Sequence, residues 1–336
     1  MQKLGVIGAG AWGTALAVVG RRAGREVRLW ALEPEVAAEI NQRHTNTPYL
    51  PGITLDPAIA ASGDLAVAAD ADIILLVTPA QHVRATCGKL KHVLRPNVPV
   101  IICAKGIERG TSSLMTDVVA ETLPGIPLMV LSGPTFAKEV ASGLPTAITL
   151  GATDMTLARS VAAAIGSPAF RPYVSSDIVG AEVGGAVKNV LAIGCGIVDG
   201  KGLGANGRAA LLARGLAEIV RLAVARGGRP ETLMGLSGLG DLVLTATSTQ
   251  SRNYSLGVAL GKGQTLEEVL GSRRSVTEGV TTAEAVVTLA AKLGVDMPIC
   301  AAIDQVLNHG AAIDAMLKGL LDRPLRDEVD AGAKGQ

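Results

Sequence analysis

Residues 3–30 have the sequence KLGVIGAGAWGTALAVVGRRAGREVRLW. A short apolar segment, Lys3 to Ile7, precedes Gly8-Ala-Gly-Ala-Trp-Gly13, which opens a helical run and leads to a second apolar segment, Glu26 to Trp30. A G-x-G-x-x-G turn between a strand and a helix is typical of dinucleotide binding. The glycines permit a tight turn, approach of the backbone to a pyrophosphate, and close packing of helix and strand. The alternative is that the glycines serve ordinary turns.

The residues after the second segment bear on the choice of cofactor. In such a unit an acid at this point binds the adenosine ribose, whereas a cation accepts a 2′-phosphate. Here the sequence continues Ala31-Leu32-Glu33-Pro34. Glu33 favours NAD if it binds the ribose, but it is equally explained as a solvated residue at the start of the next helix. NAD and NADP therefore both stay open.

Short apolar runs alternate with helical segments through the first half of the chain, as in a mostly parallel sheet covered by helices. Two of the runs are apolar at consecutive positions, which is expected of strands buried on both faces. The expected strands are Lys3–Ile7, Glu26–Trp30, Asp72–Val77, Val98–Ala104, Pro127–Leu131, Thr146–Leu150 and Phe170–Val174.

The pattern changes near Ser175 to Asp177, where long Ala- and Leu-rich segments of helical period begin. One amphipathic helix is predicted over Arg208–Arg226, ending at a Gly-Gly pair, and another over Thr281–Leu293, ending at Gly294. We therefore expect a dinucleotide-binding domain over residues 1–176, a helical substrate domain over 177–330 and a frayed tail over 331–336.

The composition excludes several classes of protein. Hydrophobic residues make up 48% of the 336 residues, and 31 Lys plus Arg nearly balance 30 Asp plus Glu. Disorder and broad electrostatic binding of nucleic acid are therefore unexpected. Because the chain has only 2 Trp, 3 Tyr and 2 Phe, its core must consist of Ala, Val, Leu and Ile, and aromatic platforms for stacking bases are not expected.

The four cysteines are far apart, and neither they nor the histidines have the spacing of metal ligands, so we expect no metal site and a reduced, cytoplasmic setting. The glycines between Leu4 and Gly20 argue against a signal peptide. We also expect no segment that spans a bilayer.

A lysine in an apolar helix is the first catalytic candidate. Lys188 lies within Val179–Val198, and its neighbours at helical spacing are small residues that would admit a second backbone or a ligand. Burial would lower the pKa of Lys188 toward a catalytic range. A lysine on a solvated face is the equally weighted alternative.

Two further candidates follow in the helical half. Asp241 ends the glycine-rich Ser237-Gly-Leu-Gly-Asp241, where a turn or helix-capping role is the alternative. Ser251-Arg252-Asn253 combines a guanidinium with two hydrogen-bonding side chains, which suits an oxyanion such as phosphate. Ser251 is also a good helix N-cap.

Many ordered segments together resemble the bacterial-type NAD(P)-dependent glycerol-3-phosphate dehydrogenase family over nearly the whole chain. The resemblance implies a Rossmann-type domain followed by a mainly α-helical domain like that of 6-phosphogluconate dehydrogenase. The segments that carry it, besides the glycine-rich turn, are Asn46–Gly52, Ala104–Glu108, Leu131–Glu139, Ala186–Val190, Gly238–Leu242, Ser251–Asn253 and Thr277–Val280.

The resemblance implies reversible hydride transfer between NAD(P)H and dihydroxyacetone phosphate, giving sn-glycerol 3-phosphate for phospholipid synthesis. Lys188 matches the catalytic proton donor and acceptor, Asp241 the acid paired with it, and Lys105 a residue near nicotinamide and substrate. Arg252 matches the main phosphate ligand. The other positions that match substrate contacts are Gly133, Thr135, Ser251 and Asn253. Those that match cofactor contacts are Gly8, Gly10, Ala11, Trp12, Gly13, Leu32, Glu33, Lys105, Ala137, Arg252, Val276 and Glu278.

One position departs from the family. Leu32 stands where members often carry His or Arg near the ribose and its 2′-phosphate, which weakens the case for NADPH. Two rival functions are a dehydrogenase of another small hydroxyacid and a non-catalytic dinucleotide-binding regulator, although a regulator would not need Lys188 and Asp241. Apolar helices in the second half make a homodimer the expected assembly.

Overall fold

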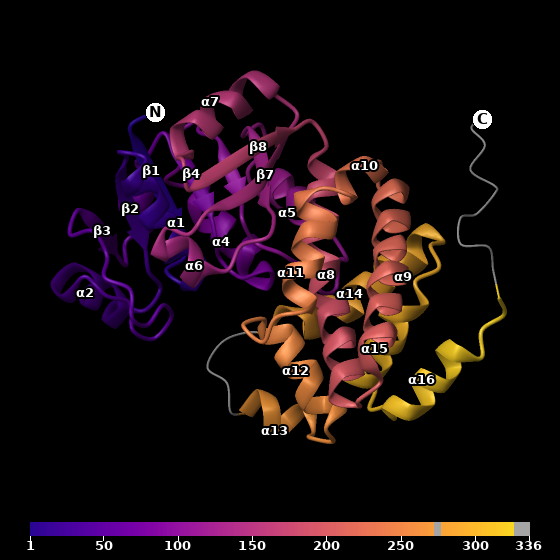
Figure 1. The fold of residues 1–336 in the computed structure, drawn as a ribbon. Helices are drawn as coiled ribbons and strands as arrows, with labels where there is room; N and C mark the ends of the chain where they lie inside the picture. The colour runs from indigo at the N-terminus through magenta and orange to yellow at the C-terminus, as the bar shows by residue number, and fades with distance from the viewer. Residues whose placement is uncertain (272–276, 326–336) are drawn as a thin grey trace.

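The computed structural model describes residues 1–271 and 277–325 of the chain. The first half forms one eight-stranded sheet in the order β3-β2-β1-β4-β5-β6-β7-β8 (Figure 1). All neighbours pair in parallel except β6 and β7, which are antiparallel. The strands are β1 Lys3–Ile7, β2 Glu26–Trp30, β3 Ile59–Ser62, β4 Ile73–Leu76, β5 Val100–Ile102, β6 Leu128–Ser132, β7 Thr146–Ala152 and β8 Phe170–Ser175.

Helices cover both faces of this sheet, as expected of a mostly parallel sheet. Apolar side chains of α1, α2, α6 and α7 pack on one face and those of α3, α4 and α5 on the other. The central strands β4 and β5 are buried at every position, as their apolar runs predicted. The helices are α1 Ala11–Arg22, α2 Pro34–Arg43, α3 Leu65–Ala69, α4 Val83–Leu90, α5 Met115–Thr122, α6 Ala137–Ser142 and α7 Met155–Ile165, with a 3-10 turn at Ala80–His82.

From residue 178 onward the described chain is helical, around the long central helix α8 (Figure 1). The two amphipathic helices predicted from the sequence are present as α9 and α14, and both begin earlier than expected. The helices are α8 Ile178–Gly200, α9 Gly204–Ala225, α10 Pro230–Leu233, α11 Asp241–Ala246, α12 Arg252–Gly261, α13 Leu266–Gly271, α14 Glu278–Leu293, α15 Pro298–Asn308 and α16 Ile313–Leu321, with a π turn at Leu236–Gly240. The expected tail, 331–336, lies outside the described residues.

Helix α8 is the one described helix that is long and apolar enough to cross a membrane. However, 89% of its most apolar window is buried inside the protein. Its role is that of a core helix, packed against α9, α11, α12 and α14. All four cysteines are free and buried, and the described residues contain no cluster of His, Cys, Asp and Glu suited to a metal ion.

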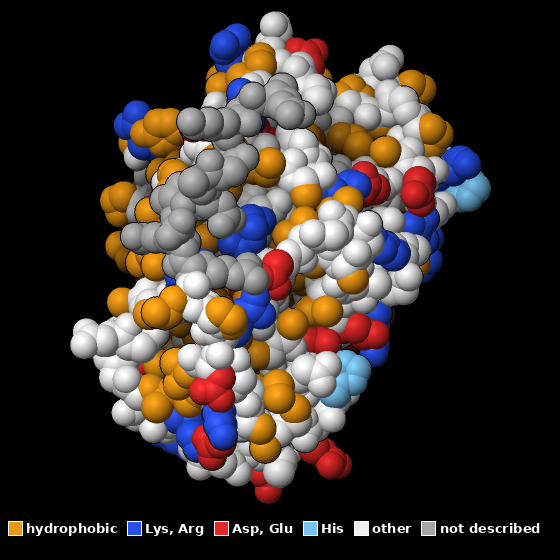
Figure 2. All heavy atoms as spheres, turned by 90° about the vertical axis from the view of Figure 1, so that its right-hand side faces the viewer, with side chains coloured by type: hydrophobic (Ala, Val, Ile, Leu, Met, Phe, Trp, Pro, Cys, Tyr) orange, Lys and Arg blue, Asp and Glu red, His pale blue; other side chains and the backbone are white. Residues whose placement is uncertain are grey.

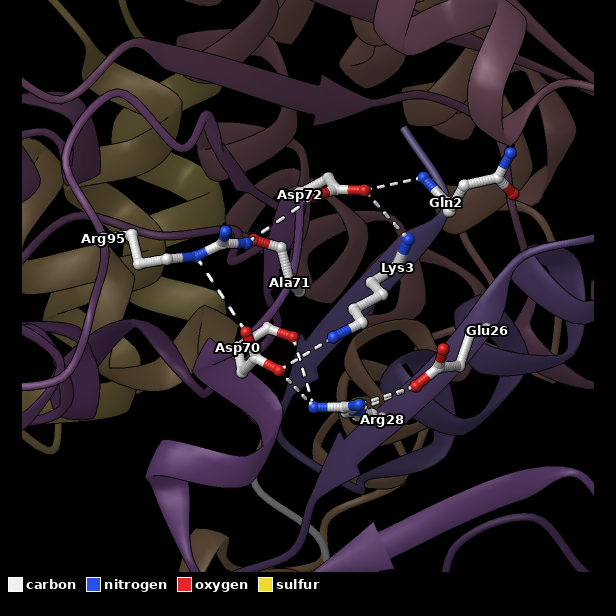
Figure 3. A network of polar contacts seen from close by, with 8 residues as sticks. All are labelled: Gln2, Lys3, Glu26, Arg28, Asp70, Ala71, Asp72 and Arg95. Atoms are coloured by element: carbon white, nitrogen blue, oxygen red, sulfur yellow. Dashed lines mark hydrogen bonds and ion pairs between the residues drawn. The ribbon is translucent and has the colours of Figure 1, made fainter.

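A network of charges joins the amino ends of β1 and β2 to the segment that precedes β4 (Figure 3). The Asp70 carboxylate accepts hydrogen bonds from Lys3 Nζ at 2.9 Å and Arg28 Nη1 at 2.7 Å. Asp72 accepts from the backbone NH groups of Gln2 and Lys3. These contacts fix the edge of the sheet opposite to the glycine-rich turn, which follows the carboxyl end of β1.

Candidate functional site

The glycine-rich turn begins at the carboxyl end of β1, where the strand order reverses between β1 and β4. Gly8 has a φ of 120° and donates its NH to Trp30 O at the end of β2. A Cβ on Gly13 would lie 1.8 Å from Gly8 O, whereas a Cβ on Gly10 would meet no atom of the described residues within 4 Å. The turn therefore needs Gly13 for its own packing, while the space at Gly10 is free for an approaching ligand.

These features fit a dinucleotide. Gly10 is the N-cap of α1, so the free NH groups and positive end of this helix face the same space and would stabilise a pyrophosphate. Trp12 Nε1 is buried, and no described residue is its hydrogen-bond partner. The turn, the helix end and the reversal of strand order agree with the general location of nucleotide sites in open α/β sheets.

Three other loops reach the same edge of the sheet. Lys105 follows β5, Gly133 follows β6, and the segment beginning at Thr78 follows β4, all at carboxyl ends of parallel strands. Lys105 Nζ donates to Gly133 O at 3.2 Å, and Thr135 Oγ1 donates to the same carbonyl. A cavity of about 220 Å³ lies beside them, lined by Pro79, Ala80, Gln81, His82, Glu278, Thr281 and Thr282.

The helical half brings Lys188 and Asp241 to this edge. Gly184 and Gly185 on α8 leave no room for side chains, because a Cβ would lie 2.5 Å from Ser237 O and 2.4 Å from Ser132 Oγ respectively. The small residues beside Lys188 thus admit a second backbone, which places the π turn and the start of α11 against α8. Lys188 is 6% exposed, so the alternative of a solvated lysine is wrong.

At the site, the Asp241 carboxylate contacts lysines from both halves of the molecule. Lys188 Nζ donates to Asp241 Oδ1 at 2.5 Å, and Lys105 Nζ donates to Asp241 Oδ2 at 2.6 Å. Asp241 is 1% exposed. It is the first residue of α11 rather than part of a loop, and its carboxylate binds the two lysines instead of capping the helix.

Burial is the largest influence on the pKa of Lys188. Desolvation and the neighbouring Lys105 ammonium lower this pKa to about 8, although Asp241 opposes the shift. Near neutral pH most Lys188 side chains are therefore protonated, but the proton is easily released. A group with this pKa can donate a proton in one direction of a reaction and accept it in the other.

The segment Ser251–Asn253 opens α12 beside this cluster. Ser251 Oγ accepts from Tyr254 NH at 3.2 Å, so the predicted N-cap is confirmed. Asn253 Nδ2 donates to Asn189 Oδ1 at 3.0 Å, and Asn253 Oδ1 accepts from Gly279 NH at 3.1 Å. These contacts fix the first turn of α12, where Arg252 stands, against α8 and α14.

Helices α8 and α12 cross in direct backbone contact. A Cβ on Gly196 would lie 2.1 Å from Tyr254 O, and one on Gly257 would lie 2.0 Å from Ile193 O. Only glycine fits at such a distance. The crossing holds the helix that carries Lys188 and the helix that carries Arg252 in a fixed relation.

The charges of the site favour an anion. Burial raises the pKa of Glu278, the first residue of α14, while Arg252, Lys105 and Lys188 lower it, so these cations lie near its carboxylate. Among the described residues, the cations Arg252, Lys105 and Lys188 gather around the two carboxylates Asp241 and Glu278, a concentration of positive charge that would attract an anion.

The remaining predicted positions that the structure describes lie around the glycine-rich turn. Ala137 begins α6, and together with Ala11 and Trp12 it packs against the apolar core of the sheet. Leu32 is 67% exposed, and Glu33 precedes α2. Val276 lies outside the described residues.

Besides Asn189, the side chains of Thr245 and Tyr49 contact the candidates but were not predicted as site residues. Thr245 Oγ1 accepts from Lys188 Nζ at 2.8 Å, and it stands four residues after Asp241 on α11, a helical spacing that would have revealed it. Tyr49 donates its hydroxyl to Glu33 Oε1 at 2.9 Å. No local pattern connects Tyr49 with Glu33, because their contact depends on how the intervening chain folds.

Comparisons with known proteins agree with this architecture. The model of the NAD-dependent glycerol-3-phosphate dehydrogenase N-terminus matches residues 3–158, and that of the C-terminus matches residues 177–318. A glycerol-3-phosphate dehydrogenase [NAD(P)+] from Caulobacter vibrioides is 58% identical over 98% of this chain and 99% of its own length. One from Rhodospirillum rubrum is 58% identical over 100% of this chain and 96% of its own length.

A solved structure is similar over the same range. The crystal structure of glycerol-3-phosphate dehydrogenase from Coxiella burnetii superimposes with a TM-score of 0.92 at 37% sequence identity, covering 96% of this chain and 99% of that chain. The likeness thus includes both the sheet and the helical half. Together with the two matching models, it shows that the chain belongs to the NAD-dependent glycerol-3-phosphate dehydrogenase family.

Proposed function

We propose that this chain catalyses the reversible reduction of dihydroxyacetone phosphate to sn-glycerol 3-phosphate, which feeds phospholipid synthesis. From its similarity to these relatives, the chain is an NAD(P)-dependent oxidoreductase that acts on a CH–OH group. The observation that carries the proposal is the buried Asp241 carboxylate shared by Lys188 and Lys105.

Each candidate residue then has a role in the reaction. When bound, the dihydronicotinamide supplies a hydride to the carbonyl carbon. Lys188 Nζ gives its proton to the carbonyl oxygen. The ketone, the hydride and this proton together form the alcohol. Asp241 orients Lys188, and Lys105 polarises the carbonyl. In the direction of alcohol oxidation, neutral Lys188 takes the hydroxyl proton.

The substrate phosphate lies at the start of α12 in this proposal. Arg252 supplies the guanidinium, and the fixed first turn of α12, which also carries Ser251 and Asn253, holds it in place. Gly133 and Thr135 complete the substrate contacts beside Lys105. Binding energy at the phosphate orients the reacting carbon, so loss of the phosphate would lower turnover as well as affinity.

The cofactor would run along the edge of the sheet from the glycine-rich turn to Glu278. Gly8, Gly10, Ala11, Trp12 and Gly13 would hold its pyrophosphate, and Leu32 and Glu33 its adenosine half. Ala137, Val276 and Glu278, with Lys105 and Arg252, would contact the rest. Residues 1–176 thus form the dinucleotide-binding domain and 177–330 the substrate domain of the proposal.

The assembly we propose is a homodimer in the cytoplasm. Large apolar side chains are exposed in the helical half at Leu203, Val224 and Leu321. The face of that half in Figure 2 carries apolar side chains between charged ones. Sedimentation velocity measures the assembly directly, and a monomer at micromolar concentration would contradict this part of the proposal.

The reaction is tested by the absorbance of reduced nicotinamide with purified protein and dihydroxyacetone phosphate. NADH and NADPH are compared in parallel, and unphosphorylated dihydroxyacetone is the control. We expect NADH or NADPH to be oxidised only when the phosphorylated ketone is present. Equal oxidation of NAD(P)H with the control would favour a dehydrogenase of another small substrate. Binding of dinucleotide without oxidation of any hydroxyacid or reduction of any ketone would favour a regulator.

A further inference from the structure

The acid that follows β2 is held beside the glycine-rich turn. Gly8 donates its NH to Trp30 O at 3.1 Å, and Glu33 stands three residues beyond Trp30 at the N-cap of α2. The Glu33 side chain makes no capping hydrogen bond. Its Oε1 instead accepts from Tyr49 Oη at 2.9 Å, so Glu33 is not simply a solvated residue at the start of a helix.

The loop that carries Tyr49 is itself fixed on the glycine-rich turn. Asn46 is fully buried, and its Nδ2 donates to Ala9 O and to Thr14 Oγ1, both at 2.8 Å. The loop therefore links the turn to Tyr49, and Tyr49 links it to Glu33. This chain of contacts places the carboxylate relative to the turn and not only relative to its own helix.

The charge around this carboxylate is negative. The pKa of Tyr49 is raised by its hydrogen bond to Glu33, by burial, and by the negative charges of Glu33 and Glu35. Leu32, the neighbouring residue, is 67% exposed and uncharged. Among the hydrogen bonds and ion pairs of the described residues, none joins Glu33 to a lysine or arginine.

A ribose diol and a 2′-phosphate require opposite partners. A carboxylate accepts hydrogen bonds from two hydroxyl groups, whereas it repels a phosphate dianion and offers it no donor. Fixing the carboxylate strengthens this discrimination, because a free side chain could turn away from the phosphate at little cost.

We propose that Glu33, held in place by Tyr49, makes this chain select NADH over NADPH. This inference rests on the proposed function only in taking the glycine-rich turn as the cofactor site. Glu33 acts on the cofactor directly, Tyr49 is a positioning residue, and Leu32, being uncharged, gives the 2′-phosphate no counter-ion at this position. We expect NADH to bind at least about tenfold more tightly than NADPH, the effect of one or two hydrogen bonds to a charged group.

The test measures binding rather than turnover. Dissociation constants for NADH and NADPH are obtained by isothermal titration calorimetry for the full chain and for four variants. Glu33→Gln should weaken the binding of NADH and strengthen the binding of NADPH. The ratio of the NADPH dissociation constant to the NADH dissociation constant should fall to about threefold or less. Tyr49→Phe should lower this ratio less, and only by weakening the binding of NADH, since the Glu33 carboxylate is present but no longer held by a hydrogen bond.

The matched controls are Glu267→Gln, which removes an exposed acid in the first turn of α13, and Tyr173→Phe, which removes the hydroxyl of an exposed tyrosine on β8. Both should keep the ratio of the unchanged chain. A ratio near one or in favour of NADPH in the unchanged chain would overturn the inference. So would an unchanged ratio in Glu33→Gln.

The outcomes separate this inference from the proposed reaction. Preference for NADH without reduction of dihydroxyacetone phosphate would support the role of Glu33 and contradict the proposed substrate. Reduction of dihydroxyacetone phosphate with equal affinity for both cofactors would support the proposed substrate and contradict the role of Glu33. Binding of neither cofactor would overturn both, because the glycine-rich turn would then not be the cofactor site.

Discussion

Asp241→Asn tests the electrostatics of the proposed site. The amide keeps the shape of the carboxylate but removes the negative charge that Lys188 Nζ contacts at 2.5 Å and Lys105 Nζ at 2.6 Å. Burial and Lys105 lower the pKa of Lys188 to about 8 even though Asp241 raises it. Without Asp241 this pKa should fall further, so Lys188 should lose its proton in the neutral range.

The size of the effect follows from the burial of the pair. Removing one partner of a buried ion pair costs about 3–5 kcal/mol, and a change of one pH unit in a pKa corresponds to about 1.4 kcal/mol. If most of this cost falls on protonated Lys188, its pKa drops by about two pH units, to about 6. About a tenth of the molecules would then be protonated at pH 7, and ketone reduction would slow about tenfold from protonation alone.

The assay is the rate of dihydroxyacetone phosphate reduction between pH 5.5 and pH 9.5, on the order of one reading per half unit. In the unchanged chain reduction requires protonated Lys188, so its rate should fall as the pH rises through about 8, and alcohol oxidation should rise over the same range. The control is Asp177→Asn, which removes a buried carboxylate that caps α8 by accepting from Gly180 NH. It should lower stability but leave the midpoint near 8.

Stability gives a second measure of the same charge. In Asp241→Asn the pKa of Lys188 in the folded state lies further below its ordinary value, so over this interval the unfolded state binds more protons and stability rises with pH. Urea unfolding should show this rise between neutral and alkaline pH. A midpoint of reduction that stays near 8 or moves upward in Asp241→Asn would refute the reasoning.

Three further outcomes follow from the site. Lys188→Ala should abolish turnover, measured by nicotinamide absorbance, and leave dinucleotide binding nearly intact; retained turnover would rule out Lys188 as the proton donor. Arg252→Ala should chiefly raise the KM for dihydroxyacetone phosphate, by about tenfold or more for a charge-assisted contact, and an unchanged KM would contradict its phosphate role. Gly10→Ala should keep the unfolding midpoint, since its Cβ meets no described atom, but should lose dinucleotide binding in calorimetry, since the Cβ fills the space for the ligand. Gly13→Ala should in addition lose about 1–3 kcal/mol of stability, because its Cβ meets Gly8 O. Equal stability of the two glycine variants would contradict the packing described for the turn.

Much of the fold could be predicted because its strands are apolar and periodic. The strands Lys3–Ile7 and Glu26–Trp30 were predicted with the bounds that the structure shows. The edge strand Ile59–Ser62 was missed, since Ala-Ala-Ser has low strand propensity and the strand depends on pairing with β2. The antiparallel direction of β7 also has no local signal, because a short helix such as α6 can join strands in either direction.

The candidate site was predictable one residue at a time but not as a geometry. The apolar surroundings of Lys188 correctly indicated its burial, and Ser251 correctly indicated a helix start. That Lys105 and Lys188 share Asp241 could not be seen from the sequence, since Lys105 follows β5, Lys188 lies on α8 and Asp241 begins α11, and the three meet only when the two halves pack. The contact of Tyr49 with Glu33 was hidden for the same reason.

The glycine crossing of α8 and α12 has a mechanical consequence. Two helices whose backbones touch cannot slide past each other without breaking van der Waals contact along the whole crossing. Lys188 and Arg252 therefore move together as parts of the rigid helical half, whereas Lys105 belongs to the half that contains the sheet. A relative movement of the two halves would therefore change the contact of Lys105 with Asp241, while the distance between Lys188 and Arg252 would stay the same.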